Sequence, residues 1–252
     1  MKTFEEQKAF VARLNLTDDM FFRHVFADRD VCEEVVRVLM KRPDLRLLEA
    51  HAQRDFTNLG SRSVTLDLYC EDERGNRISV EVQQPDDHDY AKRMRYIRAC
   101  VDVGRTERGR DYIKLPDVRT IFITTSDPFG FGSMAYEVKR TLEHFDLPVP
   151  NGTHEIYLNT SCRDGSPIGR LMGYFAKSTV EGDARFPKLS DKVRLCKENE
   201  SEVKRMCDAV EAYAQEYARK RVEEERESAR KRIEEEREAS KQPMTKDHRP
   251  DV

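Results

Sequence analysis

The sequence predicts an α/β fold that continues into a long charged helix, and three observations support this. Apolar residues recur at helical spacing on both sides of a pair of segments in which apolar and polar residues alternate. Two short, mostly apolar segments follow later in the chain, and beyond about residue 199 the composition becomes strongly charged. Strands interspersed with helices are typical of a sheet that helices cover.

The N-terminal part supplies two helical patterns. Thr17, Asp18 and Asp19 form a capping signal ahead of the apolar residues in 20–26, and a second pattern runs over 31–39 and stops before Pro43. An acidic side chain at a helix start has two interpretations: a cap that favours the helix dipole, or a ligand to a metal ion. Both stay open for Asp18.

Residues 64–70 and 78–83 alternate between apolar and polar side chains, and the segment between them contains Gly75. This pattern predicts two half-buried strands joined by a short turn. If Asp72 pairs with Asn76 around a three-residue loop, Asp67 lies directly opposite Glu81. Side chains alternate along a strand, so Gln83 shares the face of Glu81, while Val80 and Val82 point into the core.

The remaining elements follow in order. A basic helical pattern covers 90–103, strands are predicted at 118–125 and 154–159, and residues 171–175 indicate a short helix. The segment 126–132 (SDPFGFG) is interpreted as a turn with buried phenylalanines, since it lacks the spacing of a phosphate-binding loop.

The C-terminal region contains an eleven-residue repeat, in which 218–228 (ARKRVEEERES) is followed by 229–239 (ARKRIEEEREA). This spacing favours a straight or slightly right-handed helix. Its apolar stripe is thin, and opposite charges recur at helical spacing, as in Arg221 with Glu225 and Glu227 with Lys231. A solvated helix is the favoured interpretation, with self-association into a homo-oligomer as the alternative. We therefore predict a globular domain over 1–200, a charged helix over 201–240 and a disordered tail over 241–252.

Composition limits the class of protein. The formal net charge is −3, from 45 basic and 48 acidic residues, so any attraction to phosphate must come from a local patch. The chain lacks the apolar runs of a signal peptide or a membrane span, and we expect a soluble cytoplasmic protein without membrane contacts. The six cysteines form no CxxC pair and the six histidines show no ligand spacing, so neither disulfides nor a zinc site is predicted.

The predicted hairpin carries the candidate chemistry. Facing carboxylates at roughly 5 Å repel each other, whereas a bound Mg²⁺ or Mn²⁺ reverses the sign because hard cations take carboxylate and carbonyl oxygens. Asp67, Glu81 and the backbone carbonyl of Val82 are the candidate ligands. The alternative is that the two acids are ordinary surface residues of a hairpin.

The helix that follows strengthens the metal hypothesis. It carries cations with interleaved tyrosines, and a cationic face beside a carboxylate pair suits a phosphodiester substrate. The candidate DNA-binding residues are Lys92, Arg93, Arg95, Tyr96 and Arg98. The alternative is an amphipathic helix whose basic face is merely solvated.

Six segments in order resemble the recombination-promoting nuclease (Rpn)/PD-(D/E)XK family of transposases. They are TDDMFFRHVF (17–26), RSVTLDLY (62–69), VEVQ (80–83), KRMRYIRACVD (92–102), RGRDYIKLPDVRTIFITTSDPFG (108–130) and EIYLNT (155–160). The resemblance runs from about residue 14 to 215. It implies a restriction-endonuclease-like core, in which helices flank a mixed sheet, and Mg²⁺-dependent cleavage of DNA.

The resemblance also implies roles for individual residues. The strand aspartate of the family falls on Asp67, its ExQ motif on Glu81 and Gln83, and its early acidic position on Asp18, with Asp19 beside it. The R-x-R-Y motif after the hairpin falls on Arg93, Arg95 and Tyr96. Gln83 takes the place that lysine holds in most restriction-type nucleases.

Two features leave the site short of positive charge. Gln83 can orient water or phosphate but supplies no cation, and Thr65 stands where the family often has arginine. Arg93 is the candidate to replace the missing cation. The alternative function is a catalytically inactive DNA-binding or scaffolding protein that retains the fold. A third interpretation makes the charged C-terminal helix an assembly spacer.

Overall fold

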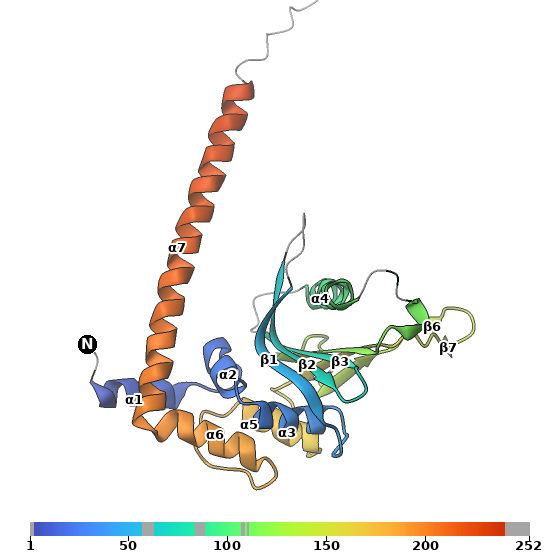
Figure 1. The fold of residues 1–252 in the computed structure, drawn as a ribbon, viewed down its shortest axis with the longest axis horizontal. Coiled ribbons are helices and arrows are strands. Elements are labelled where there is room, and N and C mark those ends of the chain that lie inside the picture. The colour runs from blue at the N-terminus through green and yellow to red at the C-terminus, as the bar shows by residue number, and fades with distance from the viewer. Residues whose placement is uncertain (1–2, 57–62, 84–88, 107–108, 110, 240–252) are drawn as a thin grey trace, which may run out of the picture. The chain divides into compact units, whose positions relative to one another are not determined.

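The computed structural model describes residues 3–56, 63–83, 89–106, 109 and 111–239 (Figure 1). Residues 1–206 form one compact unit and residues 207–252 a second. The helices are α1 Phe4–Arg13, α2 Asp19–Val25, α3 Arg29–Leu39, α4 Tyr90–Arg105, the short 3₁₀ turn Tyr112–Lys114, α5 Pro167–Phe175, α6 Pro187–Glu198 and α7 Glu200–Ala239. The strands are β1 Leu47–Phe56, β2 Val64–Asp72, β3 Arg77–Gln83, β4 Val118–Thr124, β5 Ala135–Val138, β6 Thr141–Leu142, β7 Leu147–Pro148 and β8 Thr153–Asn159.

The first unit is built on a six-stranded mixed sheet in the order β1-β2-β3-β4-β8-β5. Strands β1, β2 and β3 pair antiparallel, β3, β4 and β8 pair parallel, and β5 closes the sheet antiparallel to β8. A mixed sheet flanked by helices confirms the predicted fold class. Strand β1 was not predicted, because LLEAHAQRDF does not alternate cleanly between apolar and polar residues.

Helix α4 lies on one face of this sheet, and helices α2, α3 and α5 lie on the opposite side (Figure 1). The α4 side has its own apolar core, in which Met94 and Ile97 of the helix pack with Tyr69, Phe122 and Tyr157 of three strands. Because this core fixes α4 against the middle of the sheet, the basic residues of the helix are held beside the hairpin.

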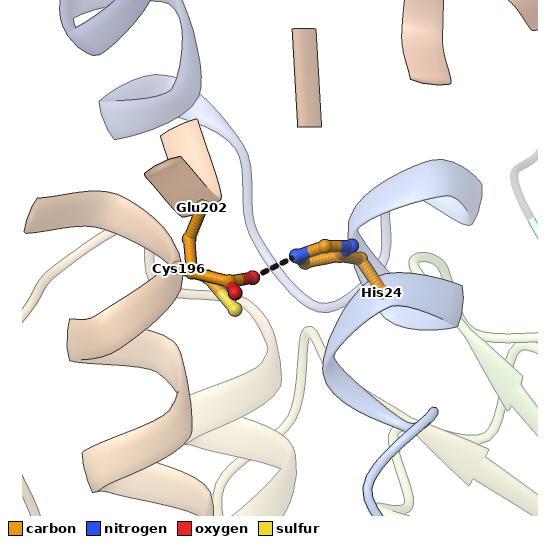
Figure 2. A group of neighbouring side chains, drawn as sticks. All are labelled: His24, Cys196 and Glu202. Carbon is orange, nitrogen blue, oxygen red and sulfur yellow. Dashed lines mark hydrogen bonds and ion pairs between the residues drawn. The ribbon is translucent and has the colours of Figure 1, made fainter. Parts of the chain in front are cut away.

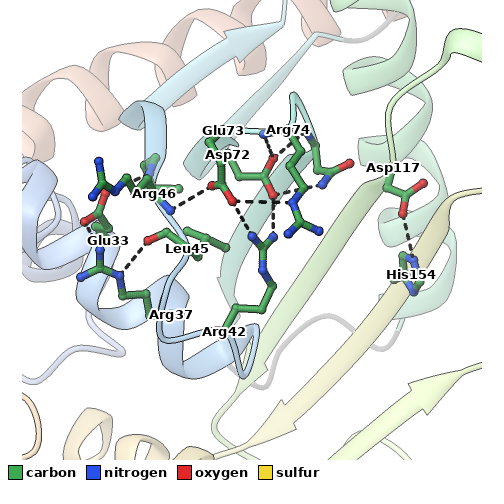
Figure 3. Close-up of polar contacts among 12 residues, drawn as sticks. Glu33, Arg37, Arg42, Leu45, Arg46, Asp72, Glu73, Arg74, Asp117 and His154 are labelled. Carbon is green, nitrogen blue, oxygen red and sulfur yellow. Dashed lines mark hydrogen bonds and ion pairs between the residues drawn. The ribbon is translucent and has the colours of Figure 1, made fainter.

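The turn between β2 and β3 is pinned by the buried carboxylate of Asp72 (Figure 3). It accepts hydrogen bonds from the backbone N–H groups of Arg74 and Asn76, both at 2.9 Å, and forms an ion pair with Arg42 at 3.0 Å. The Asp72 N–H in turn donates to the Asn76 carbonyl at 3.0 Å, and Gly75 adopts φ +78°. This confirms the predicted three-residue loop.

Strand β3 differs from the half-buried strand that the alternation predicts. Residues 77–81 are buried on both faces, and Glu81 is 0% exposed, whereas Val82 is only half-buried. The reason is that β3 lies inside the sheet between β2 and β4 and under α4, and a strand covered on both faces buries every side chain. The acidic pair is therefore no surface feature of a solvated hairpin.

The segment after β4 also corrects the sequence analysis. The prediction of buried phenylalanines is wrong, since Phe129 is 41% exposed and Phe131 is 83% exposed. The Asp127 carboxylate accepts hydrogen bonds from the N–H groups of Phe129, Gly130 and Gly132, and this fixes the loop without burying its rings.

The charged C-terminal region is helical, as expected, and belongs to the single helix α7. Val222 and Ile233 of its thin apolar stripe are about half exposed, and Arg221 pairs with Glu225 at 3.7 Å. The side chain of Glu227 and the predicted tail from residue 241 lie outside the described residues. Within the described residues, no helix combines the length and apolar character required to cross a bilayer.

Candidate metal centre

Asp67 and Glu81 meet where the β2–β3 hairpin opens. The β2–β3 pairing runs through Tyr69↔Ser79 and ends at Leu68↔Val80, so Asp67 and Glu81 are the first residues beyond the paired part of the hairpin. Beyond that point the Asp67 carboxylate, not the backbone, accepts a hydrogen bond from the Val82 N–H at 2.9 Å. The side chain of Asp67 is thereby held across the opening beside Glu81.

The carboxylate of Glu81 is fully buried, and among the described residues neither of its oxygens has a hydrogen-bond partner. The guanidinium of Arg93 is 4.0 Å from its Oε2 atom. Burial, and secondly the nearby charge of Asp67, raises the pKa of Glu81 well above its usual value. An ionised carboxylate in such a place is strongly destabilising unless a cation compensates it.

The pKa of Asp67 is raised as well. Burial raises its pKa to about 6, the Val82 N–H and Arg93 partly oppose this shift, and the charge of Asp19 adds to it. Two adjacent carboxylates with raised pKa values and too few donors form a set of oxygens that suits a hard divalent cation. The residues present therefore fit a Mg²⁺ or Mn²⁺ ion, for which the orphaned oxygens of Glu81 are the main observation.

The two acidic residues at the start of α2 point to different surroundings. Asp18 occupies the N-cap position without a side-chain cap, and its carboxylate accepts a hydrogen bond from the Asn15 N–H at 2.6 Å. Its charge acts on the buried Lys197. Asp19 acts electrostatically on both Asp67 and Glu81. The structure thus favours Asp19 as the acidic residue near the pair, in place of Asp18.

We expect Asp19→Asn to weaken Mn²⁺ binding by about tenfold, the scale on which an outer-shell group acts at a metal site. Isothermal titration calorimetry on the full chain measures this. Asp18→Asn is the matched control, because its amide oxygen still accepts the Asn15 N–H. Equal losses of affinity in the two variants would contradict the assignment of Asp19.

Two residues near Asp19 and Asp67 were not predicted from the sequence. Arg23 pairs with Asp19 at 2.6 Å and also lowers the pKa of Asp67. Gln53 of β1 lies between the residues that pair with Leu66 and Leu68, and it has φ +61°, an uncommon conformation for a residue other than glycine. When the Gln53 amide is oriented so that its oxygen and its nitrogen both face suitable partners, the oxygen accepts a hydrogen bond from Arg23. Only the i, i+4 spacing of Asp19 and Arg23 was visible in the sequence.

The two other predicted site residues lie at the end of β3: Val82, whose backbone carbonyl is the candidate ligand, and Gln83. Val82 is half-buried next to Glu81, and its carbonyl group belongs to the same strand end. The backbone of Gln83 pairs with Thr124 of β4, while its side chain lies outside the described residues.

Helix α4 separates its cations into two groups. Arg93 faces the carboxylate pair and lies 5.9 Å from the ring centroid of Phe122, while Lys92 and Arg95 are exposed. Arg98 forms an ion pair with Glu155 of β8 and is only 14% exposed. This pairing gives Arg98 a structural role between helix and sheet, so the geometry does not support it as a DNA contact.

A groove of about 580 Å³ runs between the start of β2 and α4. Its walls carry Lys92 and Arg93 of the helix, the half-buried ring of Tyr96 and, at the position where the family often has arginine, Thr65. The Thr65 hydroxyl donates to Asp55 at 2.6 Å. The groove is lined by Ser63, Val64, Thr65, Asp89, Lys92, Arg93, Tyr96 and Ile97.

A mixed sheet flanked by helices, with a carboxylate pair on its hairpin and a basic helix beside it, defines a nuclease-like α/β domain. The segment 37–143 matches the model of the PD-(D/E)XK nuclease family transposase. It includes Asp67, Glu81 and all of α4, whereas Asp19 precedes it. No curated protein and no solved structure matches the chain.

Proposed function

We propose that the chain is a divalent-metal-dependent DNA endonuclease that hydrolyses phosphodiester bonds, acting in transposition or recombination. The observation that carries this proposal is the fully buried Glu81 carboxylate, without a hydrogen-bond partner among the described residues, beside Asp67. The match to a nuclease family over residues 37–143 supports DNA as the substrate.

Asp67, Glu81 and the Val82 carbonyl would hold Mg²⁺ or Mn²⁺, and Asp19 would add negative charge near them. A divalent cation in such a site lowers the pKa of bound water and neutralises charge on the phosphate. Gln83 carries an amide that can orient water or the scissile phosphate by hydrogen bonds. Lys92 and Tyr96, which line the groove beside α4, and the exposed Arg95 would bind the DNA backbone.

Arg93 supplies the positive charge that Gln83 lacks. Its guanidinium is near enough to interact with Glu81 at 4.0 Å, and it lines the groove that would hold the phosphate. A planar guanidinium with several donors stabilises the charge that develops on phosphate oxygens. Arg93 therefore takes the place of the lysine that most restriction-type nucleases have on the strand.

Conversion of supercoiled plasmid to nicked or linear DNA tests the proposal directly. We expect cleavage with Mg²⁺ or Mn²⁺ and none with a chelator. DNA binding that weakens with salt but is accompanied by no cleavage with either metal would instead support the alternative of an inactive DNA-binding protein.

We expect Arg93→Gln to lower the cleavage rate at saturating DNA by about 10²-fold, the usual scale for losing one group that stabilises transition-state charge. Arg95→Gln is the matched control on the same helix. Being exposed, Arg95 should contribute to affinity and to its salt dependence but little to the rate. Single-turnover kinetics separates the two effects, and unchanged single-turnover cleavage in Arg93→Gln would remove Arg93 from the mechanism.

A further inference from the structure

Three helices of the first unit bring together His24 of α2, Cys196 of α6 and Glu202 from the first turns of α7 (Figure 2). One nitrogen, one sulfur and one oxygen atom of these side chains all lie within 4.8 Å of one another. The residues are 172 and 6 positions apart, which is why no ligand spacing is visible in the sequence. The cluster is separate from the carboxylate pair and takes no part in the proposed nuclease chemistry.

We propose that His24, Cys196 and Glu202 form a second metal site, for Zn²⁺ or a similar transition-metal ion. Imidazole, thiolate and carboxylate are the three ligand types that zinc binds in proteins, whereas Mg²⁺ prefers oxygen atoms alone. Three protein ligands leave the fourth tetrahedral position for water.

The surroundings of each ligand favour this proposal. The His24 Nε2 and Glu202 Oε2 atoms already face each other at 2.8 Å, where an ion would replace the proton between them. The second oxygen of Glu202 accepts a hydrogen bond from Arg205 at 2.7 Å, which orients the carboxylate and leaves Oε2 for the ion. Both side chains are largely buried, so little water competes for these atoms.

Cys196 supplies the most specific observation. It is 0% exposed, its sulfur points toward the other two side chains in Figure 2, and among the described residues the thiol has no hydrogen-bond partner. Ligand atoms around a tetrahedral zinc ion lie roughly 3.5 Å apart. A side-chain adjustment of about 1 Å would therefore close the group around an ion, and the thiol would release one proton to solvent.

Such an ion would tie α2, α6 and the start of α7 together, because each helix contributes one ligand. A ligand that binds only the folded protein stabilises it. The site is thus expected to raise the melting temperature of the chain when zinc is present, independently of whether the chain cleaves DNA.

Titration of the metal-free full chain with Co²⁺ tests the proposal by absorption spectroscopy. A thiolate ligand gives a charge-transfer band in the near ultraviolet, which ions bound at Asp67 and Glu81 cannot produce. We expect about one Co²⁺ per chain in this band and its displacement by one equivalent of Zn²⁺. Cys196→Ser should abolish the band, while Cys162→Ser, which changes a more exposed thiol, should retain it.

A second variant keeps the test valid if Cys196→Ser folds poorly. Glu202→Gln keeps one oxygen that can accept from Arg205 and replaces the oxygen facing His24 by an NH₂ group, so it should weaken metal binding at least tenfold, with a correspondingly smaller rise in melting temperature on addition of Zn²⁺. The proposal is overturned if the wild-type chain shows no charge-transfer band, or if the band survives in Cys196→Ser. Neither outcome bears on the nuclease proposal, since its assay uses Mg²⁺ and different residues.

Discussion

Asp67→Asn and Glu81→Gln should each reduce Mg²⁺-dependent plasmid cleavage by about 10³-fold or more, because each removes charge from the group that would hold the catalytic ion. The effect should be larger for Glu81, since its buried oxygens accept no hydrogen bond from the described residues, whereas Asp67 accepts one from the Val82 N–H. Both amides are nearly isosteric with the acids, and the Asp67→Asn side chain can still accept the Val82 N–H. A loss of activity would therefore report on charge, not on unfolding.

Glu71→Gln is the matched control for these two variants. Glu71 belongs to the same hairpin as Asp67, but it is the strand partner of Arg77 next to the turn and so lies away from the carboxylate pair. We expect it to cleave at the wild-type rate. Full activity in Glu81→Gln would show that the buried carboxylate is not a metal ligand and would contradict the endonuclease mechanism proposed for this site.

The same two carboxylates should make the metal-free protein less stable as the pH rises from about 4 to about 6. The pKa of Asp67 is about 6 in the folded chain against an ordinary value of 3.8, so the folded state binds more protons in this range. Stability must then fall with increasing pH, and the full penalty is present above pH 6. The shift of roughly 2 pKa units corresponds to about 3 kcal/mol. Glu81, whose pKa is also raised, acts in the same direction.

Urea unfolding in the presence of a chelator, repeated from pH 4 to pH 8, measures this penalty as the difference between wild-type and Asp67→Asn. We expect the variant to be more stable at pH 7 and nearly equal to wild-type at pH 4. Saturating Mg²⁺ should narrow the gap at pH 7, because a cation stabilises the ionised pair. An Asp67→Asn variant that is less stable than wild-type at every pH would contradict the raised pKa.

Both expected results have the same physical cause. A carboxylate pair that is buried and short of donors is poorly suited to a stable apo-protein and well suited to a divalent cation. The fold holds the hairpin at both ends: Asp72 and Arg42 fix its turn (Figure 3), and at the open end β2 still pairs with β1 and β3 with β4.

Local signals were sufficient for much of this hairpin. The alternation along 64–70 and 78–83 predicts both strands, and a three-residue loop with Gly75 sets the register, which pairs Leu68 with Val80 directly beside Asp67 and Glu81. These features depend on residues close in sequence, through turn geometry and side-chain alternation. The basic helix and the two later strands were likewise predicted from their own periodicity.

Features that depend on distant partners were not accessible in this way. Nothing in VEVQ indicates that Glu81 is completely buried, because its cover comes from β4, which is some 40 residues away, and from α4. The choice between Asp18 and Asp19 depends on how α2 docks onto the sheet, and adjacent residues on a helix point about 100° apart. Arg93 and Arg98 look alike in sequence, yet one faces Glu81 and the other is paired with Glu155.

By itself, then, the sequence determined the α/β class, the hairpin with its register, the two carboxylates and the charged C-terminal helix. Only the tertiary structure decided that Glu81 is buried without a hydrogen-bond partner among the described residues, that Asp19 and Arg93 are its charged neighbours, and that His24, Cys196 and Glu202 converge. The physical reason is the separation along the chain over which each effect acts. Strand alternation and turn chemistry act between residues a few positions apart, whereas burial and electrostatic fields depend on whatever the fold packs nearby.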